Sequence, residues 1–145
     1  MGARDNDPIS NFRHSPGLHN VGSYQVAGRP YITGSVALAT EGEDKISFPH
    51  VAKSVTVINT STDNVELRMH FSSKTTNAAV LTKYHYVSLP SYKDSVTFNV
   101  KCKEVYVSNP DGSDKGSYTV FAELTGIPAE RMYELSGSGI NEDLA

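Results

Sequence analysis

Five histidines have the side chains best suited to metal binding or proton transfer: His14, His19, His50, His70 and His85. A zinc or iron site needs two or three ligands together, commonly at i and i+2 on a strand or i and i+4 on a helix. No two histidines stand at either spacing, so we predict no metal site and no cofactor. We expect His70 on the solvent face of a strand. His85, between Tyr84 and Tyr86, is expected to be a surface strand residue.

Cys102 is the only cysteine, and it lies between Lys101 and Lys103. Neighbouring cations could lower the pKa of its thiol. A nucleophile also needs a base and an orienting group, and the sequence suggests neither nearby. Gly-x-Ser-x-Gly, Walker and Gly-x-Gly-x-x-Gly motifs are absent. We therefore expect a structural cysteine at an edge or turn between two strands, in a protein that is not an enzyme.

Three polar segments resemble binding sites in composition. The segment 109–114 contains Asn, Asp and Ser like a calcium loop, but it lacks the Asp-x-Asp-x-Asn-Gly register and the final bidentate Glu. We interpret it as a hairpin turn, and the acidic residues Glu41, Glu43 and Asp44 as a solvated loop. The glycosylation sequon that begins at Asn59 is interpreted as part of a turn.

Aromatic side chains are the remaining candidates for binding. The chain has eight tyrosines and five phenylalanines but no tryptophan. Tyr84, Tyr86, Tyr92 and Tyr106 could form a platform for a carbohydrate, although tyrosine is also common on strands and at protein interfaces. A glycan-binding module is therefore one alternative function.

Charge and hydropathy limit the possible partners. The 145 residues include 13 Lys and Arg against 16 Asp and Glu, with a net charge of −3 and a pI near 5.9. Nucleic-acid binding normally requires a basic stripe, so we expect no nucleic-acid partner. The polar N-terminus lacks a secretory signal, and no apolar run approaches the ~20 residues of a membrane helix. We expect synthesis in the cytoplasm and no membrane partner.

Alternating apolar and polar residues predict β-strands over most of the chain. The clearest segments are 65–72, 95–100, 104–108 and 118–124, and weaker ones are 36–40, 45–48, 54–59 and 83–89. Turn-forming residues separate them at 60–64 and 109–116. This pattern predicts an all-β domain over 33–127, an antiparallel β-sandwich or jelly roll of about eight strands. Residues 128–145 are expected to form a tail with a short helix over 128–135.

The N-terminal residues 1–32 have a different character. Closely spaced prolines and glycines exclude a helix, and pre-proline residues favour extended backbone. Apolar residues nevertheless recur through the segment, which a solvated linker would lack. We therefore predict an extended arm that lies on a surface, either on its own domain or on a neighbour.

The segment 15–35, which contains Pro16-Gly17-Leu18-His19-Asn20-Val21-Gly22-Ser23-Tyr24-Gln25-Val26, resembles the start of small structural proteins of tailed bacteriophages, particularly marine myovirus-like phages. In those proteins a similar segment precedes a compact β-domain. The resemblance implies a capsid decoration or cement protein on the virion surface, often a homotrimer, whose partner is the major capsid protein. A neck, tail or baseplate component is the alternative. The expected interface residues are Phe12, Pro16, Gly17, Leu18, His19, Asn20, Val21, Gly22, Ser23, Tyr24, Gln25, Val26 and Tyr31.

Overall fold

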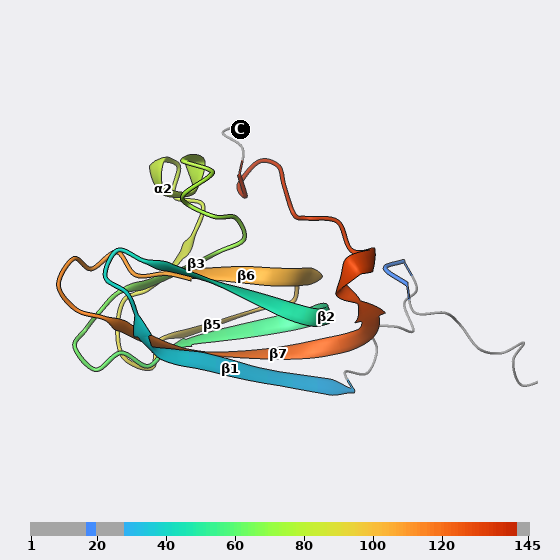
Figure 1. The fold of residues 1–145 in the computed structure, drawn as a ribbon, viewed down its shortest axis with the longest axis horizontal. Helices are drawn as coiled ribbons and strands as arrows, with labels where there is room; N and C mark the ends of the chain where they lie inside the picture. The colour runs from blue at the N-terminus through green and yellow to red at the C-terminus, as the bar shows by residue number, and fades with distance from the viewer. Residues whose placement is uncertain (1–16, 20–27, 142–145) are drawn as a thin grey trace, which may run out of the picture.

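The computed structural model describes residues 17–19 and 28–141, and this part of the chain is almost entirely antiparallel β-structure (Figure 1). Its helices are one turn each, and none is long and apolar enough to cross a membrane. The all-β expectation is confirmed. The elements are β1 (Arg29–Leu38), β2 (Glu43–Asn59), β3 (Leu67–His70), α2 (Ala79–Thr82), β4 (Val87–Leu89), β5 (Ser95–Phe98), β6 (Cys102–Ser108), β7 (Gly116–Pro128) and the 3-10 helix η2 (Ala129–Arg131).

Strand β2 belongs to both layers of the sandwich. Its first part, from Glu43 to Ser47, pairs with β6, which continues through β3 to β4. Its last part, from Val55 to Ile58, lies between β5 and β7, and β1 continues beyond β7. Figure 1 shows β3 and β6 in one layer and β1, β7 and β5 in the other. The hydrogen bonds therefore form one seven-stranded sheet that folds over on itself along β2.

Irregular pairing in the middle of β2 keeps its apolar side chains facing the core on both sides of the bend. Ile46 and Phe48 are buried in the first part, whereas Val55 and Val57 are buried in the last part. This change from even to odd positions coincides with register shifts around Ala52. A bulge changes which side of the strand a residue faces, so the core continues across both layers. Val105 and Val107 of β6 and Val120 and Ala122 of β7 join that core.

Several predicted boundaries differ from the observed ones. The separate strands expected at 45–48 and 54–59 are one strand, β2, which runs through Pro49. Proline cannot donate a ladder hydrogen bond, and it is tolerated here because it lies in the irregular segment of β2. The strand expected over 83–89 is wrong at its start, because α2 and a turn precede β4. The strand expected at 36–40 is the end of β1, which begins at Arg29, inside the segment expected as an arm.

The C-terminal helix expected over 128–135 is reduced to the single turn η2. Met132, directly after that turn, is extended, with φ −105° and ψ 138°. Its side chain is 4% exposed in a small cluster with Val51 and Ile127. Burial of the Met132 side chain requires the chain to lie flat on the sheet, so the helix ends there.

Candidate functional site

An extended polar network surrounds His70, the last residue of β3, and this histidine is only 1% exposed. The prediction that His70 faces solvent is wrong. The segment that follows β3 folds back over this side of the strand, where the Asn77 side chain donates a hydrogen bond to the Ser72 hydroxyl, at 2.7 Å. The Tyr106 ring stacks on the imidazole, with centroids 5.9 Å apart. The side of β3 that carries His70 is therefore covered at this residue, although Arg68 on the same side stays partly exposed.

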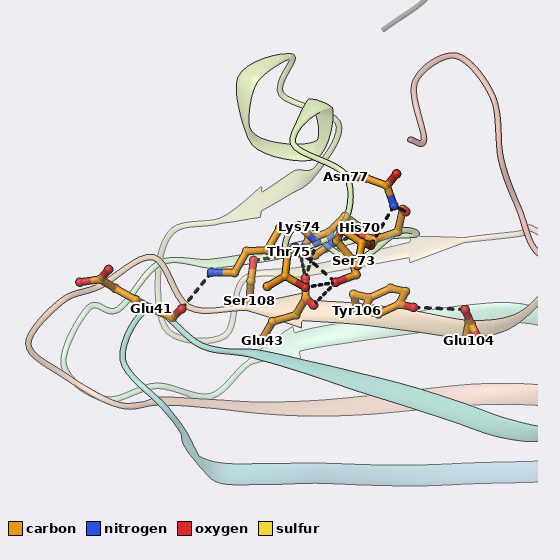
Figure 2. A network of polar contacts seen from close by, with 12 residues as sticks. Glu41, Glu43, His70, Ser73, Lys74, Thr75, Asn77, Glu104, Tyr106 and Ser108 are labelled. Atoms are coloured by element: carbon orange, nitrogen blue, oxygen red, sulfur yellow. Dashed lines mark hydrogen bonds and ion pairs between the residues drawn. The ribbon is translucent and has the colours of Figure 1, made fainter. Parts of the chain in front are cut away.

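The hydrogen bonds of His70 define its tautomer (Figure 2). Nδ1 lies 2.7 Å from the carbonyl oxygen of Ser72, and Nε2 lies 2.9 Å from the hydroxyl of Ser108. A carbonyl only accepts, so Nδ1 carries the proton and Nε2 accepts a hydrogen bond from Ser108. Burial lowers the pKa of His70 below its usual value, although the Ser72 carbonyl and Glu43 oppose this shift. The imidazole is therefore neutral near pH 7.

Glu43 connects this histidine to the loop after β3. Its two carboxylate oxygens accept hydrogen bonds from the Ser73 hydroxyl and from the backbone N–H of Lys74, both at 2.8 Å. One of those oxygens lies 3.8 Å from Nε2 of His70. The Lys74 ammonium also donates to the carbonyl of Glu41, at 3.0 Å. Figure 2 shows that these contacts join the start of β2 to the loop and to β6. Glu41 and Glu43, expected to lie in a solvated acidic loop, therefore hold the loop after β3 in place.

A serine hydroxyl that donates to a neutral imidazole is also the local geometry of an activated nucleophile. Here Ser108 and His70 are each 1% exposed. The nearby carboxylate of Glu43 approaches Nε2, whereas Nδ1 is held by a backbone carbonyl. A triad places its carboxylate on Nδ1 and leaves the serine accessible to substrate. The geometry therefore supports a structural role, in which three chain segments are fastened together.

Cys102 is fully buried in the main core as the first residue of β6. The expected position at an edge or turn is wrong, because Cys102 pairs with Ala52 of β2 inside the sheet. Burial and the charge of Glu104 raise the pKa of the thiol to about 12. The flanking lysines therefore do not activate it.

The sequon residue Asn59 is a buried polar anchor at the end of β2, with 0% exposure. Its amide nitrogen donates to the carbonyls of Val65 and Leu89, both at 2.8 Å, and its oxygen accepts from the N–H of Ser61 at 2.9 Å. These bonds join the turn after β2 to the end of β4. Asn59 itself is the last residue of β2 and not a turn residue, whereas Thr60 and Ser61 lie in the connection that follows.

The calcium-like segment joins β6 to β7, which pair with β2 and not with each other, so the hairpin interpretation is wrong. Its own side chains stabilise this connection. Asn109 is buried and accepts from the N–H of Asp111, whose carboxylate accepts from the N–H groups of Ser113 and Asp114. These backbone donors lower the pKa of Asp111. Within residues 17–19 and 28–141, His, Cys, Asp and Glu side chains form no group of three that could hold a metal ion.

The four tyrosines considered for a carbohydrate platform lie in different surroundings. Tyr84 and Tyr86 are neighbours, with ring centroids 6.2 Å apart. Tyr106 is partly buried against His70, and Tyr92 lies in the loop between β4 and β5. His85 follows α2 in a turn, so the expectation of a strand residue is wrong. The sequence alone does not show which of these rings come together.

Four of the expected interface residues fall within the described part of the chain. Leu18 packs against the cluster of Val51, Ile127 and Met132, and its carbonyl accepts from the Lys101 ammonium at 2.7 Å. Tyr31 meets Phe48 edge to face, with centroids 5.4 Å apart. Gly17 is half-buried and His19 is exposed. The remaining residues lie outside the described ranges: Phe12, Pro16, Asn20, Val21, Gly22, Ser23, Tyr24, Gln25 and Val26.

Sequence analysis did not identify an exposed apolar surface on the layer that contains β1 and β7. Strand β1 lies at the edge of the sheet, where it pairs with β7. Ile32 of β1 and Phe121 of β7 are cross-strand partners and are 69% and 36% exposed, and Val36 further along β1 is 85% exposed. We call Ile32, Val36 and Phe121 the edge patch. Large exposed apolar groups on an edge strand mark a surface suited to protein contact.

These features define an all-β, sandwich-like protein. A buried polar network around His70 joins three of its chain segments, and its edge strand carries exposed apolar residues. Comparison with protein-family models, curated proteins and solved structures gives no match.

Proposed function

We propose that this chain is a non-enzymatic structural protein of a tailed-phage virion, a decoration or cement protein that binds the major capsid protein and stabilises the head. The observation that carries the proposal is the edge patch on β1 and β7, because β1 begins at Arg29, within the end of the predicted arm. The similarity of residues 15–35 to phage structural proteins supplies the biological context. The proposed location is the outer surface of the capsid.

The edge patch and the arm are suited to the same kind of contact. An edge strand offers unpaired backbone groups to an extended segment of another subunit, and apolar side chains beside it add buried area. An arm that becomes ordered on a partner covers a large surface with few residues. Because Leu18 and Tyr31 contact their own domain, we assign shell contact chiefly to the arm residues before Gly17, to residues 20–26 and to the edge patch.

Homotrimeric assembly is part of this proposal and rests on the resemblance. A closed ring of three copies would give each copy the same contact with a lattice of repeating subunits. Sedimentation equilibrium of the full chain tests the oligomeric state separately from capsid binding. A monomer that still decorates capsids would remove the trimer from the proposal and leave the capsid role intact.

The experiment that tests the capsid role mixes purified protein with capsids that lack it, followed by sedimentation and electron microscopy. We expect saturable binding at hundreds of copies for each particle. Deletion of residues 2–15, combined with Val21→Asp and Tyr24→Ala, should abolish binding while the contact of Leu18 keeps the domain folded. Tyr133→Ala, an exposed change at the other end of the chain, is the control and should bind normally.

Copy number distinguishes the head from other locations. Six to a few tens of copies for each virion, with density on the neck, tail or baseplate, would replace the decoration role by one in those structures. Full decoration by the variant that lacks residues 2–15 and carries the two substitutions would show that the arm is not the contact.

A further inference from the structure

A hollow of about 310 Å³ lies between the end of β3, the segment after α2 and the C-terminal tail. Figure 1 shows α2 and the tail on the same side of the molecule, beyond β3 and β6. Aromatic and apolar side chains dominate its wall, and Gly139 of the C-terminal tail lies at one side. The residues that matter for the argument are Phe71, Tyr84, His85 and Tyr86.

The backbone at Tyr84 adopts a strained left-handed conformation, and its side chain is exposed. The N–H of His85 donates to the carbonyl oxygen of Val80 at 3.0 Å, and the N–H of Tyr84 donates to the carbonyl oxygen of Leu81 at 3.4 Å. Together these bonds form a Schellman motif at the end of α2, with Tyr84 at the left-handed position and φ of 59°. Glycine is the usual residue there because a side chain is disfavoured. The Tyr84 side chain is nevertheless 76% exposed, so its packing does not explain the choice of residue.

The second wall of the hollow, at Tyr86, lies next to a cation. The Tyr86 ring makes an angle of 55° with that of Tyr84. The guanidinium of Arg68 lies 4.5 Å from the centroid of the Tyr86 ring, and Glu66 holds this guanidinium at 3.3 Å. Glu66 also accepts a hydrogen bond from Ser88 of β4, at 2.5 Å. Because Arg68 is already paired with a carboxylate, this wall favours a neutral ligand over an anion.

His85 adds an unsatisfied polar atom to this aromatic site. Its Nδ1 is buried and has no hydrogen-bond partner among the described residues. Buried polar atoms are nearly always paired, and His85 lines the hollow, so a ligand group there is a candidate for the missing partner. Two angled aromatic rings, an imidazole nitrogen and a volume at the lower end of ligand sites are together the features of a small-molecule site.

We propose that this hollow binds one or two rings of a neutral saccharide. The apolar C–H face of a sugar ring packs on the faces of Tyr84 and Tyr86, and a hydroxyl pairs with Nδ1 of His85. This inference does not rest on the capsid role, because a head, tail or unrelated β-protein could carry the same site. It limits the carbohydrate platform to Tyr84 and Tyr86 and leaves Tyr92 and Tyr106 outside it.

Saturation-transfer NMR of the full chain tests the site with a panel of neutral tri- and tetrasaccharides built from glucose, galactose and N-acetylglucosamine. We expect at least one member to receive saturation from tyrosine ring protons. Tyr84→Gly and Tyr86→Ala should each weaken that binding by roughly tenfold, which is the scale of one lost aromatic contact. Tyr92→Ala removes an exposed tyrosine outside the hollow and should leave the affinity unchanged.

Tyr84→Gly also separates loss of binding from loss of fold. Glycine relieves the left-handed strain, so the thermal midpoint of this variant should equal or exceed that of the natural chain. Absence of binding to every saccharide in the panel would overturn the proposal. Saccharide binding that survives both Tyr84→Gly and Tyr86→Ala would also overturn it. The same holds if no saccharide binds and a virion protein binds instead through these two tyrosines.

Discussion

The Ser108 hydroxyl lies 2.9 Å from Nε2 of His70, although 38 residues separate the two in sequence. This contact joins β6 to the end of β3, and in the neutral imidazole Nε2 accepts the hydrogen bond from the Ser108 hydroxyl. Protonation of Nε2 would replace this acceptor with a donor. The stability of the fold therefore depends on the protonation state of His70, and through it on pH.

The first prediction concerns acid stability. The usual pKa of histidine is 6.5, and burial lowers the pKa of His70 in the folded chain. Below about pH 6.5 the unfolded chain therefore binds more protons than the folded chain, so the free energy of unfolding falls as pH decreases. The slope from this one group is at most about 1.4 kcal/mol for each pH unit. Urea denaturation at pH 5.5, 6.5 and 7.5 measures it.

Two variants assign this slope to His70. His70→Gln should be less stable at pH 7.5 but should lose most of the slope between pH 7.5 and 5.5. His19→Gln removes an exposed histidine and should keep the slope of the natural chain. An unchanged slope in His70→Gln would show that another group is responsible.

The second prediction tests the partner of that histidine. Ser108→Ala leaves Nε2 of His70 buried without a donor, which costs about 1–3 kcal/mol of folding free energy. Ser95→Ala, at an exposed position of β5, is the matched control and should stay within about 0.5 kcal/mol of the natural chain. Chemical denaturation at pH 7.5 compares them. Equal stability of the two variants would show that the Ser108–His70 hydrogen bond does not stabilise the contact between β6 and the end of β3.

The third prediction concerns the reactivity of Cys102. Its thiol is fully buried and its pKa is raised to about 12, so thiolate is scarce and inaccessible near pH 7. We expect the native chain to resist iodoacetamide and the chain in strong urea to react at the rate of a free cysteine. Mass spectrometry after timed quenching provides the measurement. Fast labelling without denaturant would show that Cys102 is accessible in the native state.

The fourth prediction separates association from folding at the edge patch. Ile32→Thr combined with Val36→Thr removes exposed apolar groups and retains β-branched side chains suited to a strand. We expect a change in folding free energy of no more than about 1 kcal/mol and a clear loss of capsid binding or self-association. Thr97→Val, on the opposite edge of that layer, serves as the comparison. Undiminished association of the double variant would exclude the edge patch as a contact.

The sequence by itself determined most strand positions and the all-β class. Alternation through 95–98, 105–107 and 118–124 corresponds to β5, β6 and β7, because one side of each strand packs in the core and the other side does not. The turn residues at 60–64 and 109–115 fall between strands as expected, whereas Gly116 is already the first residue of β7. Local periodicity is sufficient where a strand has one covered face.

Only the tertiary structure decided the features that depend on distant segments. His70 is buried because residues 72–77 fold over β3, and its alternation pattern contains no signal of that cover. Strand β2 continues through Pro49 because β6 and β7 supply pairing on either side of the bend. Leu18 packs on its own domain because Val51, Ile127 and Met132 come together there. Such contacts join residues far apart in the chain, and no local pattern specifies them.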